Sequence, residues 1–564
     1  MGKFLLNKPG EKLILLGNEA IVRGALEAGV QFVSTYPGTP ASEIGNTFSQ
    51  IAKDAGVYFE FSTNEKVALE AGAGASFSGQ RVLVAMKDFG LNVASDFLIP
   101  LCYSGVKGGM VILVADDPSC WSSAQSEQNT RAFAYLAHIP ILEPSTPQEC
   151  KDFIKLGFEL SEKFEIPILI RTTTRVSHQS APVVLDKIIK RNKKAEFVKN
   201  PRKFSTMPPR VLEMKQELLD KIEKIREFSE TSSLNQIARG QTSGRLGIIT
   251  SGVSYLYVKE AMEELNINLP VLKLGFFHPL PEKKIQKFIK NLKKVLVVEE
   301  LEPFLEKEIK ILAKDTNPCL PAGRQNLQIS GKSHLSQIGE LRPEQVISAV
   351  SKFSGKKTNF DFARHRQEFS NLKITKRYPQ FCPGCPYWFV FPTLRRIVPK
   401  DTIFGGEIGC YMLAAYPPHR LQDYLYCMGS SVGIAHGIKK TLQRNSGQAK
   451  QKLITFVGDS SFFHASIPAL INAVFNKSSP LIIILDNRTT AMTGHQPNPG
   501  VGKTGMGDTA PEIKIEDIVR ACGVKNLKVV DQQNVKEFEE TVKDFLEKEE
   551  VSVIIARHPC KFVK

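Results

Sequence analysis

Residues 452–490 have the sequence KLITFVGDSSFFHASIPALINAVFNKSSPLIIILDNRTT, and this stretch decides the fold. Two short apolar runs, the second of them rich in isoleucine, flank a segment whose apolar residues have helical spacing. Buried strands that alternate with helices are typical of parallel α/β layers, because parallel neighbours need a crossover connection. We therefore predict a strand–helix–strand unit here, with two adjacent strand ends that can carry a site.

Polar residues follow both predicted strands. The first strand delivers Gly458, Asp459 and Ser460 at its carboxyl end, where open α/β sheets bind ligands. The second strand ends close to Asn487 and Thr489. A hard divalent cation such as Mg²⁺ needs oxygen ligands at fixed positions, which a carboxylate, an amide oxygen and the backbone carbonyl of Thr489 can supply. The alternative is a chance strand–turn–helix with a Gly-Asp turn.

The same alternation extends over most of the chain, so the predicted fold class is α/β with three parallel-sheet α/β domains. Runs such as RVLVAMK (81–87) and KKVLVVEEL (293–301) predict buried strands, and a lysine-rich stretch with one helix separates two of the domains. The expected organisation is an α/β domain over 1–185, a charged linker over 186–243, a second α/β domain over 244–350 with an insertion or loop near 316–338, a linker over 351–375 and a third α/β domain over 376–564.

Composition restricts the class of protein. The chain has 564 residues, too many for one hydrophobic core, and no apolar run approaches the roughly 20 residues that span a bilayer. The amino-terminal residues lack an adequate apolar stretch and a small-residue cleavage site, so we expect a cytoplasmic protein with no membrane partner. Ten cysteines in a chain of this length indicate thiols, ligands or packing residues rather than a disulfide framework.

The formal net charge is +16, but the lysines are spread over Lys187–Lys224 and Lys283–Lys294. No basic run carries interleaved aromatic residues or a nucleic-acid module, so we expect no nucleic-acid partner. Most of these lysines are expected on solvated helix faces. The alternative is a docking surface for an acidic electron carrier, because opposite charge raises the rate of encounter.

The pattern around Asp459 and Asn487 resembles the thiamine-diphosphate motif, in which Gly-Asp-Gly is followed after about two dozen residues by Asn. Ser460 replaces the last glycine, as it does in the ferredoxin-oxidoreductase branch of these enzymes. The likeness extends to TYPGTPASEI (35–44), STNEKVALEAGAGASFSG (62–79) and CPGCPYW (382–388). Together these segments resemble the large subunit of indolepyruvate ferredoxin oxidoreductase over most of the chain, weakly in the lysine-rich linker and in the loop around residues 319–337.

The resemblance implies a pyrimidine-binding domain, a transketolase C-terminal-like domain and a diphosphate-binding domain, in that order. Glu65 resembles the family glutamate that hydrogen-bonds a pyrimidine ring nitrogen of thiamine diphosphate, which favours the imino tautomer that removes the thiazolium proton. The alternative for Glu65 is an acid in the first turn of a helix, stabilised by the helix dipole. Thr39 resembles the threonine that meets the substrate carboxylate in pyruvate ferredoxin oxidoreductase, and a plain Pro-Gly turn is its alternative.

Two more segments match the family around the cofactor. Met428, Gly429 and Ser430 match a loop that runs beside it, where glycine permits close backbone approach; an ordinary turn before a helix is the alternative. His464 lies in a Phe-Phe-His stretch found near the diphosphate, either as an acid/base group or as a structural histidine. At Glu407 the family often has aspartate, so this chain keeps the charge and changes the side-chain length.

The resemblance implies that carbon dioxide leaves an aryl pyruvate, electrons pass in single steps to ferredoxin, and coenzyme A accepts the acyl group. It also implies thiamine diphosphate and Mg²⁺ as cofactors and a hetero-oligomer with the family's small subunit. Two other classes stay open: a thiamine-diphosphate-dependent 2-oxo-acid decarboxylase without redox chemistry, and a degenerate assembly subunit. Glu65, Asp459 and Asn487 are all present, which argues against the second.

Cys382, Cys385 and Cys410 resemble three of the four iron–sulfur ligands in the diphosphate-binding subunit of related enzymes. A fourth ligand is not obvious, and Cys427 and Cys522 are candidates only by their domain. The alternative is that the first two cysteines shape a turn and Cys410 is a small packing residue. The family's large subunit normally ends in a ferredoxin-like module with two runs of closely spaced cysteines, and this sequence contains no such run.

Overall fold

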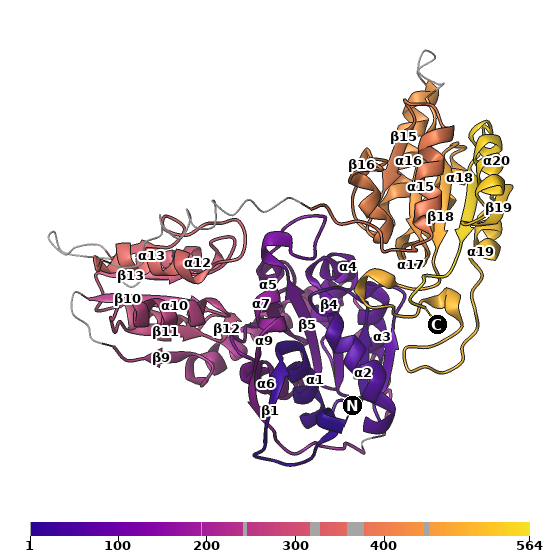
Figure 1. The fold of residues 1–564 in the computed structure, drawn as a ribbon. Helices are drawn as coiled ribbons and strands as arrows, with labels where there is room; N and C mark the ends of the chain where they lie inside the picture. The colour runs from indigo at the N-terminus through magenta and orange to yellow at the C-terminus, as the bar shows by residue number, and fades with distance from the viewer. Residues whose placement is uncertain are drawn as a thin grey trace. The chain divides into compact units, whose positions relative to one another are not determined.

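The computed structural model describes residues 2–192, 194–240, 245–315, 327–357, 377–444 and 451–563. Contacts between residues divide the chain into two compact units (Figure 1). The first unit is Met1–Phe59 with Glu65–Lys373, and the second is Glu60–Asn64 with Ile374–Lys564. Most of the expected linker over 351–375 and residues 316–326 of the expected insertion lie outside the described residues.

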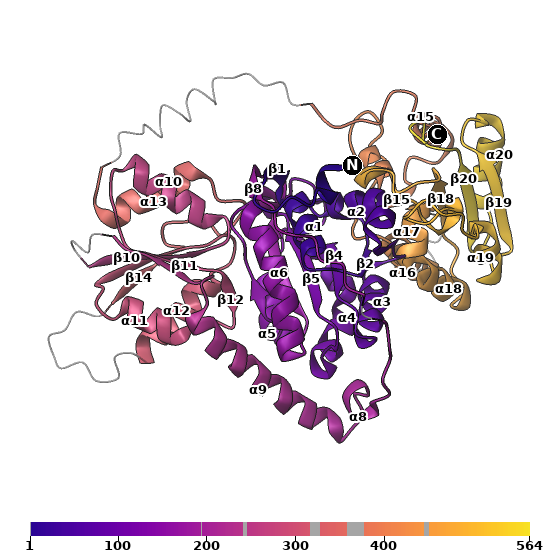
Figure 2. The ribbon, with the colours of Figure 1, turned by 90° about the horizontal axis from the view of Figure 1, so that it is seen from below.

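The first unit contains a seven-stranded sheet with the order β12-β6-β7-β5-β4-β2-β3, in which β2 is Phe32–Thr35 and β3 is Tyr58–Phe61. Its central strands, β4 (Val82–Lys87), β5 (Met110–Asp116) and β7 (Ile168–Thr173), are parallel neighbours and fully buried. Strands buried on both faces are expected to be continuous apolar runs, and the run over residues 81–87 predicted β4 in this way. The helices form two packed pairs (Figure 2): α1 (Gly17–Glu27) with α6 (Pro147–Phe164), and α3 (Glu65–Phe77) with α4 (Asp88–Ser104).

The same unit holds a five-stranded sheet with the order β14-β13-β10-β11-β9. Its parallel core consists of β13 (Lys294–Val298), β10 (Leu246–Ser251) and β11 (Val271–Leu274). The expectation of a loop over residues 327–338 is wrong in part, because β14 (Gln328–Ser330) pairs in parallel with β13. In the lysine-rich segment, α9 (Arg210–Thr231) precedes β9 (Gln236–Ala238), which pairs antiparallel with β11.

Strand pairing and buried charge join these two sheets. Strand β12 (Phe276–His278) follows β11 in the chain but pairs antiparallel with β6 (Ile141–Leu142) of the larger sheet. The guanidinium of Arg131 binds Glu143 at 2.7 Å and Glu299 at 2.8 Å, and all three side chains are almost fully buried. Removing one partner of such a pair leaves an uncompensated buried charge, so the two sheets depend on each other.

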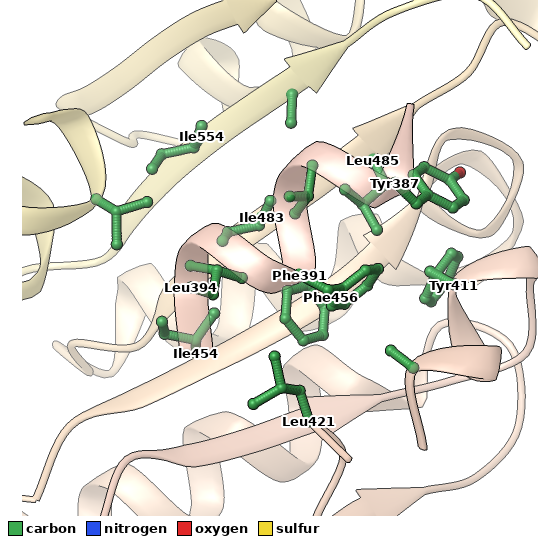
Figure 3. Packing of buried hydrophobic residues seen from close by; sticks show 14 of the residues in the cluster. Tyr387, Phe391, Leu394, Tyr411, Leu421, Ile454, Phe456, Ile483, Leu485 and Ile554 are labelled. Carbon is green, nitrogen blue, oxygen red and sulfur yellow. The ribbon is translucent and has the colours of Figure 1, made fainter. Parts of the chain in front are cut away.

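The second unit contains a six-stranded, all-parallel sheet with the order β16-β15-β17-β18-β20-β19, whose edge strands are β16 (Tyr424–Leu425) and β19 (Asn526–Asp531). Strands β17 (Leu453–Gly458), β18 (Leu481–Asp486) and β20 (Ser552–Arg557) form its centre. Helix α15 (Tyr387–Ile397) covers one face, where Phe391 lies against Phe456 of β17 (Figure 3).

The predicted fold class, α/β with parallel-dominated sheets, is confirmed. Within the described residues, no helix combines the length and apolar character that crossing a membrane requires.

Candidate active site

Asp459 and Asn487 directly follow β17 and β18, which are parallel neighbours with Gly458 in register with Leu485. Both residues are therefore at the same edge of the sheet. The backbone N–H of Thr489 donates to Asp459 Oδ2 at 3.1 Å and to Asn487 Oδ1 at 3.3 Å. The structure thus brings together the three residues expected to be magnesium ligands.

The electrostatics of Asp459 favour a bound cation. Burial, followed by the charge of the neighbouring Asp486, raises the pKa of Asp459 to about 7. A divalent cation would offset both effects. In the part of the chain that the structure describes, no three His, Cys, Asp or Glu side chains are grouped to hold a metal ion. A cation at Asp459 would therefore take its other ligands from amide, carbonyl and diphosphate oxygens, and such an oxygen set fits Mg²⁺.

Asn498 belongs to this site, although no pattern in the sequence indicates it. Its Nδ2 donates to Asp459 Oδ2 at 3.0 Å and to Ser460 Oγ at 3.2 Å. The Ser460 hydroxyl also lies 2.7 Å from Thr490 Oγ1. The serine that replaces the usual glycine is therefore held by two polar neighbours, and its hydroxyl also lies 3.3 Å from Asp459 Oδ1.

The loop of Met428, Gly429 and Ser430 leads into α16 (Ser430–Arg444). Gly429 has φ +82°, and a Cβ there would lie 2.6 Å from the Cβ of Ala465, so both its conformation and its packing require glycine. Ala465 is part of the π-helical turn η5 (Phe462–Ser466), which also carries the buried His464. This loop and the Phe-Phe-His stretch therefore pack on one another.

Glu65 is the first residue of α3 and is buried. Its side chain lies beside the backbone of Gly90 in α4. Thr39 lies in the loop before α2 (Ser42–Ala55), with its hydroxyl 3.3 Å from the Ser42 hydroxyl. Both residues belong to the first unit, on the side where β4 leads into α4.

Two charged residues at the end of β4 were missed by the sequence analysis. The ammonium of Lys87 donates to the carbonyl of Ser122 at 3.1 Å, and the Ser122 hydroxyl donates to the carbonyl of Thr39 at 3.2 Å. Burial lowers the pKa of Lys87, and Asp117 at 3.5 Å partly opposes this effect. Asp88 Oδ2 is buried and has no hydrogen-bond partner among the described residues. Asp459 was indicated because it is a polar residue that follows an apolar strand. Lys87 and Asp88 have the corresponding position at the end of β4.

Cys410 interacts electrostatically with the two other expected cluster ligands and with a fourth cysteine, Cys560, although among the described residues these thiols are not grouped as a single-ion site. Burial, followed by the thiols of Cys385, Cys560 and Cys382, raises the pKa of Cys410 to about 12. The backbone N–H of Cys560 donates to the carbonyl of Asn487 at 2.9 Å, which fixes the carboxyl-terminal segment beside the strand ends. Next to it, the Lys561 ammonium donates to the carbonyl of Pro383 at 2.6 Å, in the turn between Cys382 and Cys385.

Family models match three successive parts of the chain. The model described as "Pyruvate flavodoxin/ferredoxin oxidoreductase, thiamine diP-bdg" matches residues 23–231. The model described as "Indolepyruvate oxidoreductase domain" matches residues 236–355, and "Thiamine pyrophosphate enzyme, C-terminal TPP binding domain" matches residues 407–556. The last match contains the strand ends with Asp459 and Asn487.

Curated proteins are similar over nearly the whole chain. "Indolepyruvate oxidoreductase subunit IorA" of Methanothermobacter thermautotrophicus is 46% identical over 561 residues, covering 98% of this chain and 87% of that protein. The protein of the same name from Pyrococcus horikoshii is 44% identical over 571 residues, covering 99% of this chain and 87% of that protein.

Proposed function

The chain belongs to the family of indolepyruvate oxidoreductase subunit IorA, and on that basis we propose that its reaction is the oxidative decarboxylation of aryl pyruvates such as indolepyruvate to acyl-coenzyme A. It is a subunit of a thiamine-diphosphate-dependent 2-oxo-acid ferredoxin oxidoreductase. A non-oxidative decarboxylase is not favoured, because these relatives are named as oxidoreductases.

Asp459, Asn487 and the carbonyl of Thr489 are proposed to hold Mg²⁺ and, through it, the diphosphate of the cofactor. The buried, cation-favouring position of Asp459 is the single observation that supports this assignment most directly. Gly458 and Ser460, together with the loop of Met428, Gly429 and Ser430, would line the diphosphate. His464 is proposed as an acid/base group on the same side.

Glu65 is proposed to hold a proton at a pyrimidine ring nitrogen of the cofactor. When bound, thiamine diphosphate supplies the electron sink into which carbon dioxide departs. Thr39 would donate its hydroxyl hydrogen to the substrate carboxylate, and the Lys87 ammonium would supply positive charge to the same group. Ser122 hydrogen-bonds both segments, which supports a common role for them.

Cys382, Cys385, Cys410 and Cys560 are proposed to bind an iron–sulfur cluster. A cluster with several irons separates its thiolates more widely than a single ion does, so four neighbouring thiols suit it without forming a single-ion site. Electrons would then pass to ferredoxin. The small subunit would complete a hetero-oligomer, and this hetero-oligomer would bind the 2-oxo acid and coenzyme A.

The test is an anaerobic assay of the purified enzyme against a panel of 2-oxo acids, with and without coenzyme A and ferredoxin. We expect two equivalents of singly reduced ferredoxin for each acyl-coenzyme A formed, because the oxidation releases two electrons, and we expect aryl pyruvates to be the best substrates. Release of an aldehyde without ferredoxin reduction would instead identify the decarboxylase.

A further inference from the structure

A fully buried carboxylate, that of Glu407, lies beside the diphosphate-binding residues but is not an expected ligand. Glu407 directly follows β15 (Ile403–Gly406), and its exposed fraction is 0%. Burial raises the pKa of Glu407 to about 7, so the hydrogen bonds from Tyr411, Ser461 and Gly429 offset only part of the cost of burying the charge. Burying the charge of this carboxylate costs free energy of folding, so we expect the residue to have a role other than stability.

The two carboxylate oxygens bind two different parts of the chain. Oε1 accepts the hydroxyl hydrogen of Tyr411 at 2.9 Å. Oε2 accepts the backbone N–H of Gly429, in the loop expected to run beside the cofactor. Gly429 also packs closely on Ala465, since an added Cβ would lie 2.6 Å from the Ala465 Cβ.

Tyr411 extends the contact to the end of β17. Its hydroxyl oxygen accepts the N–H of Gly458, the residue before Asp459, at 2.9 Å. The ring is 2% exposed and belongs to the aromatic cluster beneath the strand ends (Figure 3). Glu407 is thus connected to Gly429 directly and to Gly458 through one buried phenol.

We propose that Glu407 is a positioning residue, which holds the Gly429 loop and the Gly458–Asp459 strand end in the arrangement that binds the diphosphate and its metal ion. The inference rests on the proposed function. The two donors need one accepting oxygen each; a carboxylate presents two and an amide only one, so a carboxylate suits this bridge better than an amide. A preformed site also avoids the cost of ordering two segments when the cofactor binds.

The test compares Glu407→Gln with Glu407→Asp in the purified enzyme. Two quantities are measured: the dissociation constant of thiamine diphosphate at fixed Mg²⁺, and the thermal midpoint of the cofactor-free protein. We expect Glu407→Gln to weaken binding by about tenfold to a hundredfold, the range for hydrogen bonds to a charged group. Glu407→Asp, which keeps the charge, should recover most of the affinity.

The matched control is Gln532→Ala, which removes a buried side chain that donates to the Ala556 carbonyl at 2.6 Å in the same sheet. It should lower the thermal midpoint and leave the dissociation constant within about twofold, the change that a shift of a few tenths of a kcal/mol produces. If Glu407→Gln does not fold, Tyr411→Phe replaces it, since it leaves the Gly458 amide without its acceptor.

An unchanged dissociation constant in the folded Glu407→Gln or Tyr411→Phe variant would overturn the proposal, whatever the thermal midpoint. Failure of the wild-type enzyme to bind thiamine diphosphate would instead overturn the proposed function and the positioning role with it. The two failures are therefore distinguishable in one titration series.

Discussion

The Glu65 side chain lies against the backbone of Gly90: a Cβ built at position 90 would be 2.5 Å from the Glu65 Cγ and 2.8 Å from its Oε1. A buried interior packed at crystal density has no room for such an approach, so any side chain at position 90 must displace the carboxylate. The contact joins α3 to α4 and sets the position of the proposed catalytic acid.

Gly90→Ala should therefore slow exchange of the thiazolium proton by roughly a hundredfold, the effect of about 1 Å of misplacement. The exchange rate is measured by NMR with thiamine diphosphate bound. Gly74→Ala is the matched control, because it lies in α3 with no atom within 4 Å of an added Cβ. Equal exchange rates in the two variants would contradict the positional role of Gly90.

Glu65→Gln should leave the cofactor bound and slow the same exchange by about 10²–10⁴, the usual contribution of general acid–base catalysis. Glutamine preserves the volume beside Gly90 but cannot carry the negative charge. Wild-type exchange in this variant would remove Glu65 from the mechanism.

Asp459→Ala should abolish Mg²⁺-dependent binding of thiamine diphosphate, because the cation loses its proposed carboxylate ligand. The measurement is a cofactor titration with Mg²⁺ and with a chelator. Asp544→Ala, at an exposed acid of the same unit, is the control and should bind normally. If the two variants have the same affinity, the assignment of Asp459 is wrong.

Cys560→Ser should lose iron from anaerobically purified enzyme, which otherwise should hold about four irons per chain in this group of thiols. Carrier reduction should fall with the iron, while decarboxylation continues. Cys522→Ser should retain its iron, because Cys522 packs against the hydrophobic core. Loss of iron from Cys522→Ser instead would return that residue to the ligand set.

The free energy of unfolding of the cofactor-free protein should fall as the pH rises through the range set by Asp88. Burial, followed by the charge of Asp116, raises the pKa of Asp88 from 3.8 to about 8, with Lys87 opposing and Asp117 adding to the shift. The folded protein binds this proton more tightly than the unfolded chain does, so its stabilising effect is complete below 3.8 and is lost by about pH 8. Asp88→Asn should remove that part of the pH dependence, measured as thermal midpoints. A constant difference between the two proteins from pH 4 to 8 would contradict the role of Asp88.

Elements with an apolar pattern of their own were predictable, whereas those that depend on a distant partner were not. Strand β18 is a continuous buried run, and its apolar pattern alone is enough to place Asn487 at a strand end. Strand β14 (Gln328–Ser330) has no such pattern, and it forms by pairing in parallel with β13. Asn498 contacts Asp459, and Cys560 contacts Asn487, only because the chain folds back on the strand ends. No local spacing in the sequence could therefore indicate these two residues.

The pairing of β12 with β6 has a practical consequence for anyone who divides this chain for expression. A fragment that ends at residue 185 would contain β6 but not β12, and it would expose an unpaired strand edge that favours aggregation. The same cut would separate Arg131 from Glu299, one of its two buried counter-charges. Soluble fragments should therefore begin before β1 (Lys12–Leu16) and continue at least through α13 (Pro343–Ser354), so that both sheets of the first unit are retained.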